Sequence, residues 1–173
     1  VRWLTIPVNV KGRYHQRIDE TTISDPSWGR SHFDTLRQAY RATPHFDLFA
    51  GELERLYLHP PSERLSDVNR AFIDWVNGVL QISTPLAWST DYPVDEARAR
   101  RDDDSDPSEL LAALSEAAGA DVYVSGPAAR TYLENERFER RGIRVDWHEY
   151  GVYPDYDQPH PPFEHAVSVL DLL

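Results

Sequence analysis

The sequence of 173 residues carries 29 acidic and 18 basic side chains, which gives a formal net charge of −11 at neutral pH. Binding to nucleic acid through phosphates needs a basic face, and no dense Lys/Arg cluster occurs, so we expect no nucleic-acid partner. The lack of cysteine excludes disulfides, thiolate metal sites and cysteine nucleophiles, and no apolar run approaches the roughly 20 residues of a membrane span.

The length fits a single domain over residues 1–173, with enough chain to bury a hydrophobic core. Because neither a membrane span nor a targeting segment is visible, we expect a cytoplasmic protein with no membrane partner. The chain opens on Val1 and contains no methionine, so we expect the sequence to lack an N-terminal segment of the complete protein.

The first half of the chain predicts a hairpin followed by a helical middle section. Residues 3–8 and 17–24 have the composition of strands and flank a turn at residues 11–13, which predicts an N-terminal hairpin. Asp25-Pro26-Ser27 then favours a helix start, with proline near the first helical positions. Apolar residues recur three and four positions apart in three amphipathic helices, over residues 28–40, 46–58 and 62–79.

The second half alternates strand and helix patterns, which predicts an α/β fold with a small, partly parallel sheet flanked by helices. Right-handed crossovers between consecutive strands would make the strands parallel. The expected strands are residues 86–89, 122–125 and 143–148, and the expected helices are residues 107–118, 128–140 and 163–173. The crowded Arg and Asp residues between positions 91 and 106 favour a solvated, mobile loop, and they lack the ligand spacing of an EF-hand calcium site.

Residues 119–133 form the main candidate for a ligand site. Residues 122–124 are typical of a buried strand, and Ser125-Gly126-Pro127 breaks that strand before a new helix. Free backbone N–H groups at such a strand end are common ligand contacts. We expect Ser125 to bind substrate through its hydroxyl and Gly126 to let the substrate approach the backbone. The alternative is an ordinary turn without a ligand, and the Gly-x-Ser-x-Gly elbow of serine hydrolases is absent.

Parallel strands would bring polar residues from three strand ends to one edge of the sheet. Asp91 follows the first expected strand, and Ser125 ends the second. His148 and Tyr150 follow the third. This convergence gathers a carboxylate, a hydroxyl and an imidazole, so we assign His148 a catalytic role and assign Asp91 and Tyr150 to substrate binding.

Tyr150 and Tyr153 belong to a tail rich in Tyr, Pro and Asp, in which aromatic faces beside carboxylates suit a sugar. A proline-ordered loop held by buried tyrosines is an equal alternative. In the first helix, His32 is our general-base candidate because imidazole titrates near neutrality, and we expect Arg37 beside it to contact substrate. A lone helical histidine is more often structural. No zinc spacing, dinucleotide motif or P-loop occurs, so we expect no metal and no cofactor.

Several segments spread over nearly the whole chain carry a family resemblance: residues 3–8, His32, residues 38–40, 119–129, 132–133, 142–143 and 168–173. Together they resemble the WbqC-like protein family, whose genes often lie with bacterial surface-polysaccharide and amino-sugar genes. The resemblance implies a transferase-like enzyme that transfers a group onto an amino sugar, a nucleotide-linked sugar or a comparable small amine. The alternative is a non-catalytic protein that binds an enzyme or a sugar intermediate of such a biosynthetic cluster. Similar proteins carry a histidine where this chain has Gly151, so any role of that histidine is missing here.

Overall fold

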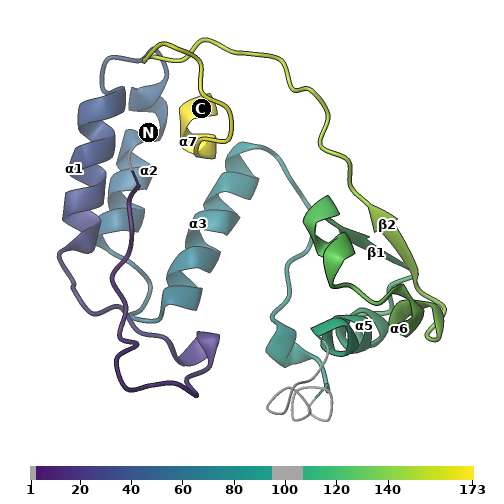
Figure 1. Cartoon of the computed structure of the whole chain (residues 1–173). Coiled ribbons are helices and arrows are strands. Elements are labelled where there is room, and N and C mark those ends of the chain that lie inside the picture. The colour runs from purple at the N-terminus through teal and green to yellow at the C-terminus, as the bar shows by residue number, and fades with distance from the viewer. Residues whose placement is uncertain (1–2, 95–106) are drawn as a thin grey trace. The chain divides into compact units, whose positions relative to one another are not determined.

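The structure is a computed structural model that describes residues 3–94 and 107–173 (Figure 1). Most of the expected charged loop between positions 91 and 106 lies outside the described residues. Contacts divide the chain into two compact units. We call residues 1–83 with 154–173 the helical unit, and residues 84–153 the sheet unit. No helix among the described residues is long and apolar enough to cross a membrane.

The helical unit confirms the expected helical middle section. Its elements are η1 (Ile18–Glu20), α1 (Trp28–Tyr40), α2 (Phe46–Leu58), α3 (Leu65–Val79) and α7 (Val169–Leu172). The expected last helix over 163–173 shrinks to one turn, because Ala166 adopts a positive φ of 57° and Ser168 caps a new start by accepting the Leu170 N–H. Figure 1 shows α1, α2 and α3 side by side.

The N-terminal hairpin is not formed. Antiparallel pairing is limited to a single bridge between Val8 and Ile23, because the expected return strand is interrupted by η1. Arg17 and Asp19 form an exposed ion pair at 2.7 Å at the start of η1, and the Glu20 carboxylate accepts the Arg17 N–H at 3.1 Å, which favours the turn over an extended chain. On its other edge the same segment pairs with the entrance to α3, where the Ile23 N–H donates to the carbonyl of Glu63 and Thr22 bridges Arg64.

Helices α1 and α2 touch backbone to backbone at Gly29. A Cβ at this position would overlap the backbone carbonyl of Tyr57, so only glycine fits. The close approach surrounds the Tyr57 ring with aromatic neighbours: Trp28 at 5.7 Å, His32 at 6.1 Å and Phe72 of α3 at 4.8 Å between ring centroids. These contacts explain why the aromatic stripes of the three helices face one another.

The sheet unit confirms two of the three expected strands. Its elements are η2 (Ser89–Asp91), α5 (Pro107–Ala117), β1 (Val122–Ser125), η4 (Pro127–Thr131), α6 (Asn135–Glu139) and β2 (Arg144–Trp147). The two strands pair in parallel, with Val122 opposite Arg144 and Ser125 opposite Trp147. One face of the pair lies on a core of Ala112, Phe138 and Ile143, to which Tyr123 and Val145 contribute.

The expected strand at 86–89 is wrong, and the sheet has two strands rather than three among the described residues. The Asp91 carboxylate accepts the Trp88 N–H at 2.8 Å and caps the short 3₁₀ helix η2. This local bond competes with strand pairing, as short acidic side chains do at helix starts. Likewise, the expected helix over 128–140 is divided into η4 and α6, because the buried Ser108 hydroxyl accepts the Glu134 N–H that a continuous helix would use.

The Gly29 contact predicts a large difference between two helical glycines. We expect Gly29→Ala to lower the free energy of unfolding by about 3 kcal/mol or more, because backbone atoms of α2 must move to admit the methyl group. Gly51→Ala in α2 is the matched control, since a Cβ there meets no atom within 4 Å and should stabilise the helix by about 0.5–1 kcal/mol. Urea unfolding followed by circular dichroism measures both changes, and equal stabilities would show that the two helices do not touch at Gly29.

Candidate functional site

The carboxyl end of the strand pair brings together four of the residues expected at the site. Ser125 ends β1, and its carbonyl accepts the N–H of His148 at 2.8 Å, just beyond β2. A Cβ built on Gly126 would lie 3.3 Å from the hydroxyl of Tyr150. The His148 and Tyr150 rings meet edge to face, with centroids 5.0 Å apart. We call Ser125, Gly126, His148 and Tyr150 the rim.

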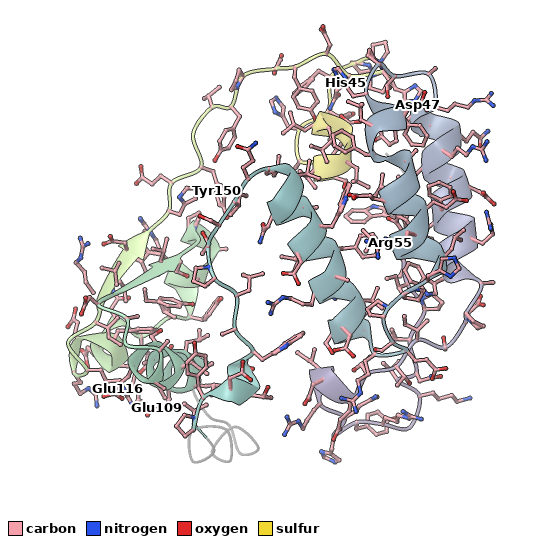
Figure 2. The ribbon with its side chains drawn as sticks, turned by 180° about the vertical axis from the view of Figure 1, so that it is seen from behind. His45, Asp47, Arg55, Glu109, Glu116 and Tyr150 are labelled. Carbon is pink, nitrogen blue, oxygen red and sulfur yellow. The ribbon has the colours of Figure 1, made fainter. Side chains whose placement is uncertain are left out.

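The Ser125 side chain is the buried member of the rim. Its residue is 9% exposed, and its hydroxyl forms no hydrogen bond with any described residue. Gln16 Oε1 is the buried side-chain atom without a partner among the described residues, so the Ser125 hydroxyl keeps some contact with solvent and can bond to a ligand. Tyr150 is 67% exposed and stands at the end of β2 in Figure 2. The rim therefore combines a sheltered hydroxyl with an accessible phenol and imidazole.

Arg130 is a neighbour of the rim that the sequence analysis missed. Its guanidinium carbon lies 5.1 Å from the centre of the Trp147 ring, and Trp147 is paired with Ser125. A cation stacked on tryptophan is attracted by the ring while its N–H groups stay available. The only sequence signal was a basic residue shortly after the central turn. Arg130 supplies a positive charge that could contact a phosphate or carboxylate of a ligand.

The backbone of the central turn differs from the expected anion-binding helix start. The helix that follows Gly126 is the five-residue 3₁₀ helix η4, and the Ala129 N–H is already bonded to the Gly126 carbonyl. Gly126 itself has a φ of −75° and a ψ of 157°, so the turn does not need the left-handed conformation. The rim consequently depends on side chains rather than on free backbone N–H groups.

Two other expected residues belong to the sheet unit without reaching the rim through any described contact. Asp91 uses its carboxylate to cap η2, as described above. Tyr153 is exposed, and its ring has no described partner. Their assignment to substrate binding therefore stays a prediction. Among the described residues, no group of three or more His, Asp or Glu side chains is placed to hold a metal ion.

His32 and Arg37 lie on α1 in the helical unit. His32 is 8% exposed, and its ring meets the edge of Trp28 with centroids 5.3 Å apart. Burial lowers the pKa of His32, and a hydrogen bond to the backbone of Thr5 offsets part of that shift. These surroundings favour the structural interpretation of His32 over a general base. Arg37 is exposed and lines a shallow depression together with Asp34 and Arg41.

The lowered pKa of His32 makes stability depend on pH. The unfolded chain takes up this proton near pH 6.5, whereas the folded protein resists it until lower pH. Stabilisation by the neutral ring is therefore complete above that value and is lost as the pH falls toward the folded-state pKa. We expect His32→Gln to cost about 1–2 kcal/mol at neutral pH and to flatten the fall in Tm between about pH 7.5 and 5.

The matched control for this prediction is His15→Gln, because His15 is exposed and its replacement should leave the pH profile of Tm unchanged. Differential scanning calorimetry across the pH range gives the comparison. Parallel profiles for the His32→Gln protein and the unmodified protein would contradict the burial of a neutral imidazole.

The sequence analysis also missed a cavity in the helical unit, lined by the end of α1, the start of α2 and the C-terminal tail. Figure 2 shows His45 and Asp47 at the start of α2, beside this part of the tail. Tyr40 donates to the carboxylate of Asp171 across a separation of 131 residues. No spacing rule connects residues so far apart, so the sequence carried no signal for this pairing.

Comparison with known proteins gives one family. The model of the WbqC-like protein family matches residues 1–173. The uncharacterized protein Rv1507c of Mycobacterium tuberculosis is 41% identical over 173 residues, which are 100% of this chain and 71% of that protein. Its printed name gives no activity. No solved structure matches the chain significantly.

Proposed function

Because the chain belongs to the WbqC-like protein family, we propose that it is a biosynthetic enzyme that transfers a group onto an amino sugar, a nucleotide-linked sugar or a similar small amine. The observation that supports the proposal is the meeting of three polar residues at the end of the strand pair: the Ser125 carbonyl accepts the His148 N–H, and the His148 ring meets the ring of Tyr150, whose phenol lies close to Gly126. Three groups that exchange protons or hydrogen bonds are held at the end of a paired strand. That arrangement suits a polar substrate of small size.

The roles of the rim follow from the chemistry of group transfer. An acceptor amine or hydroxyl must lose a proton as its new bond forms, and we assign that proton to the exposed imidazole of His148. Ser125 and Tyr150 would orient the acceptor through hydrogen bonds, since each hydroxyl both donates and accepts. Arg130 would bind a phosphate of a nucleotide-linked sugar or a carboxylate of a donor. The transferred group's carbon joins the acceptor while the leaving group departs with its electron pair.

A non-catalytic binding protein is the second candidate. No described hydrogen bond joins the side chains of Ser125 and His148, so the rim lacks the nucleophile–base pair of covalent catalysis. The strand pair also exposes Val124, at 63%, on the face away from its core. An exposed valine on a sheet suits contact with a partner protein. Measurements of turnover distinguish this candidate from the enzyme.

The first test is a thermal-shift screen of the chain against nucleotide sugars, amino sugars and activated acyl donors, followed by turnover assays with the compounds that raise Tm. We expect His148→Gln to lower kcat by about 10²–10⁴-fold with a smaller effect on KM, as loss of a general base does. Ser125→Ala should mainly raise KM. Thr131→Val is the matched control for a lost hydroxyl, because Thr131 bonds only to the Ala128 carbonyl within η4. Ligand binding with no turnover for any pair of compounds would favour the non-catalytic candidate.

The space between Gly126 and Tyr150 gives a second test. The backbone of Gly126 accommodates alanine without strain, so Gly126→Ala should change the free energy of unfolding by less than about 1 kcal/mol. Its methyl group would nevertheless lie 3.3 Å from the Tyr150 hydroxyl and displace it by a few tenths of an ångström. We expect weaker binding of the ligand found in the screen, measured by isothermal titration calorimetry.

The control for this substitution is to make Gly126→Ala in a protein that already carries Tyr150→Phe. Because phenylalanine has no hydroxyl at the contact, adding Gly126→Ala to Tyr150→Phe should weaken binding much less than it does in the unmodified protein. Unchanged affinity in Gly126→Ala, or a loss that only follows Tm, would mean that the turn is a scaffold and that the site lies elsewhere.

A further inference from the structure

The helical unit contains a cavity of about 460 Å³ that the proposed chemistry of the rim does not use. Its walls are the end of α1, the first turns of α2, Trp75 of α3 and two stretches of the C-terminal tail, and all of them belong to this unit. Sites for small molecules have volumes of roughly 300–1,000 Å³. The cavity is therefore large enough for a compound with one ring and a short side chain.

Aromatic rings form much of the wall. Tyr40, Phe46, Phe49 and Trp75 all line the cavity. Trp75 is held in place from two directions: its indole N–H donates to the Glu52 carboxylate at 2.6 Å, and its ring meets Phe49 edge to face at 6.2 Å. A ring fixed in this way loses little freedom when a ligand binds. Aromatic faces also attract cations.

A hydrogen-bonded carboxylate forms another part of the lining. Asp171 accepts hydrogen bonds from Tyr40 at 2.8 Å and from Tyr156 at 2.9 Å. Burial first, and the hydrogen bond to Asp171 second, raise the pKa of Tyr40, so the phenol keeps the proton that it donates to the Asp171 carboxylate. The Gln158 side chain adds a bond to the Tyr156 hydroxyl and two bonds to the backbone of Glu164. This network fixes the tail against α1 with a negative charge at the cavity.

The charges around the cavity have one sign. Asp157 and Asp171 line it, and none of the lining residues that the structure describes is Lys or Arg. Asp157 is exposed and forms no hydrogen bond or ion pair with a described residue. Arg37 and Arg41 of α1 line a separate depression. Arg55 is a basic residue of α2, but it lies in the last turn of that helix, far from His45 at the cavity (Figure 2).

The start of α2 does not reverse this balance. A helix start attracts anions through its partial positive charge, but Asp47 in the first turn of α2 already supplies a negative charge there. An anionic ligand in the cavity would meet two carboxylates and, among the described residues, no Lys or Arg side chain. A cation with an apolar body would instead meet opposite charge and aromatic faces.

We propose that this cavity binds an organic ammonium ion carried on an apolar body, with Asp157 pairing with the ammonium group and the aromatic walls contacting the body. This site is independent of the chemistry proposed for the rim. Its ligand class is set by the described lining: two aspartate carboxylates and four aromatic rings, with no Lys or Arg among the described residues. The imidazoles of His45 and His160 at the same cavity can accept a hydrogen bond from the ammonium group.

The test compares three compounds of similar shape and different charge on the chain of 173 residues: 2-phenylethylammonium, 2-phenylethanol and phenylacetate. Isothermal titration calorimetry should show binding of the ammonium, about tenfold weaker binding of the alcohol and none of the carboxylate, because only the first can pair with Asp157. Asp157→Asn should weaken binding of the ammonium about tenfold and leave that of the alcohol unchanged. Higher salt should weaken the ammonium alone.

Asp155→Asn is the matched control. Asp155 is also exposed and lies two positions away, but it faces His165 at 3.8 Å and does not line the cavity, so its replacement should leave the affinity for the ammonium unchanged. Ala39→Phe should abolish binding of the ammonium and the alcohol by filling the cavity. The proposal is overturned if the ammonium does not bind, if phenylacetate binds as well, if the two Asp variants behave alike, or if Ala39→Phe binds normally.

Discussion

The close approach of two helix backbones at Gly29 is the contact on which the helical unit depends. Because this position has no side chain, the first turn of α1 can lie against the carbonyl of Tyr57 near the end of α2. The Tyr57 ring then contacts Trp28 on one helix and Phe72 on another, so a single glycine sets the spacing of three helices. Burial raises the pKa of Tyr57 to about 12, which agrees with a ring shielded from water.

The sheet unit depends on the register of its two short strands. With Ser125 opposite Trp147, the chain leaves β2 directly beside the end of β1, and His148 is bonded to the Ser125 carbonyl at that point. A shift of one residue would turn Ser125 to the opposite face of the sheet. The Arg141 guanidinium helps to hold this register, because it bonds to Glu109 at 2.6 Å and to Glu116 at 3.1 Å and so ties the end of α6 to α5. Figure 2 shows both carboxylates on α5.

Local patterns predicted the elements whose residues interact with near neighbours in sequence. Such patterns predicted the helices α1 and α2 and the short strands β1 and β2. Together with the expected parallel pairing of the strands, they also predicted that Ser125, His148 and Tyr150 lie at one end of the sheet. Asp91 was separated from that group because its own side chain caps η2, a bond that the strand pattern did not reveal. The hairpin failed because η1 interrupts its return strand, and the pattern also did not reveal that Ile23 bonds to Glu63, 40 positions along the chain. The Tyr40–Asp171 pair is more distant still, and periodicity contains no information on it.

The bond between Tyr40 and Asp171 has a consequence for how the protein is made. It joins two parts of the helical unit that are separated in sequence by the whole sheet unit, residues 84–153. On the ribosome, α1, α2 and α3 emerge before the sheet unit, and their cavity lacks its tail wall until residues 157–173 have also been synthesised. The sheet unit is continuous in sequence, so it can complete its own core while the helical unit is still waiting for its last turn. The apolar lining of the cavity is therefore exposed longest during synthesis, at the stage when a nascent chain is most prone to aggregate.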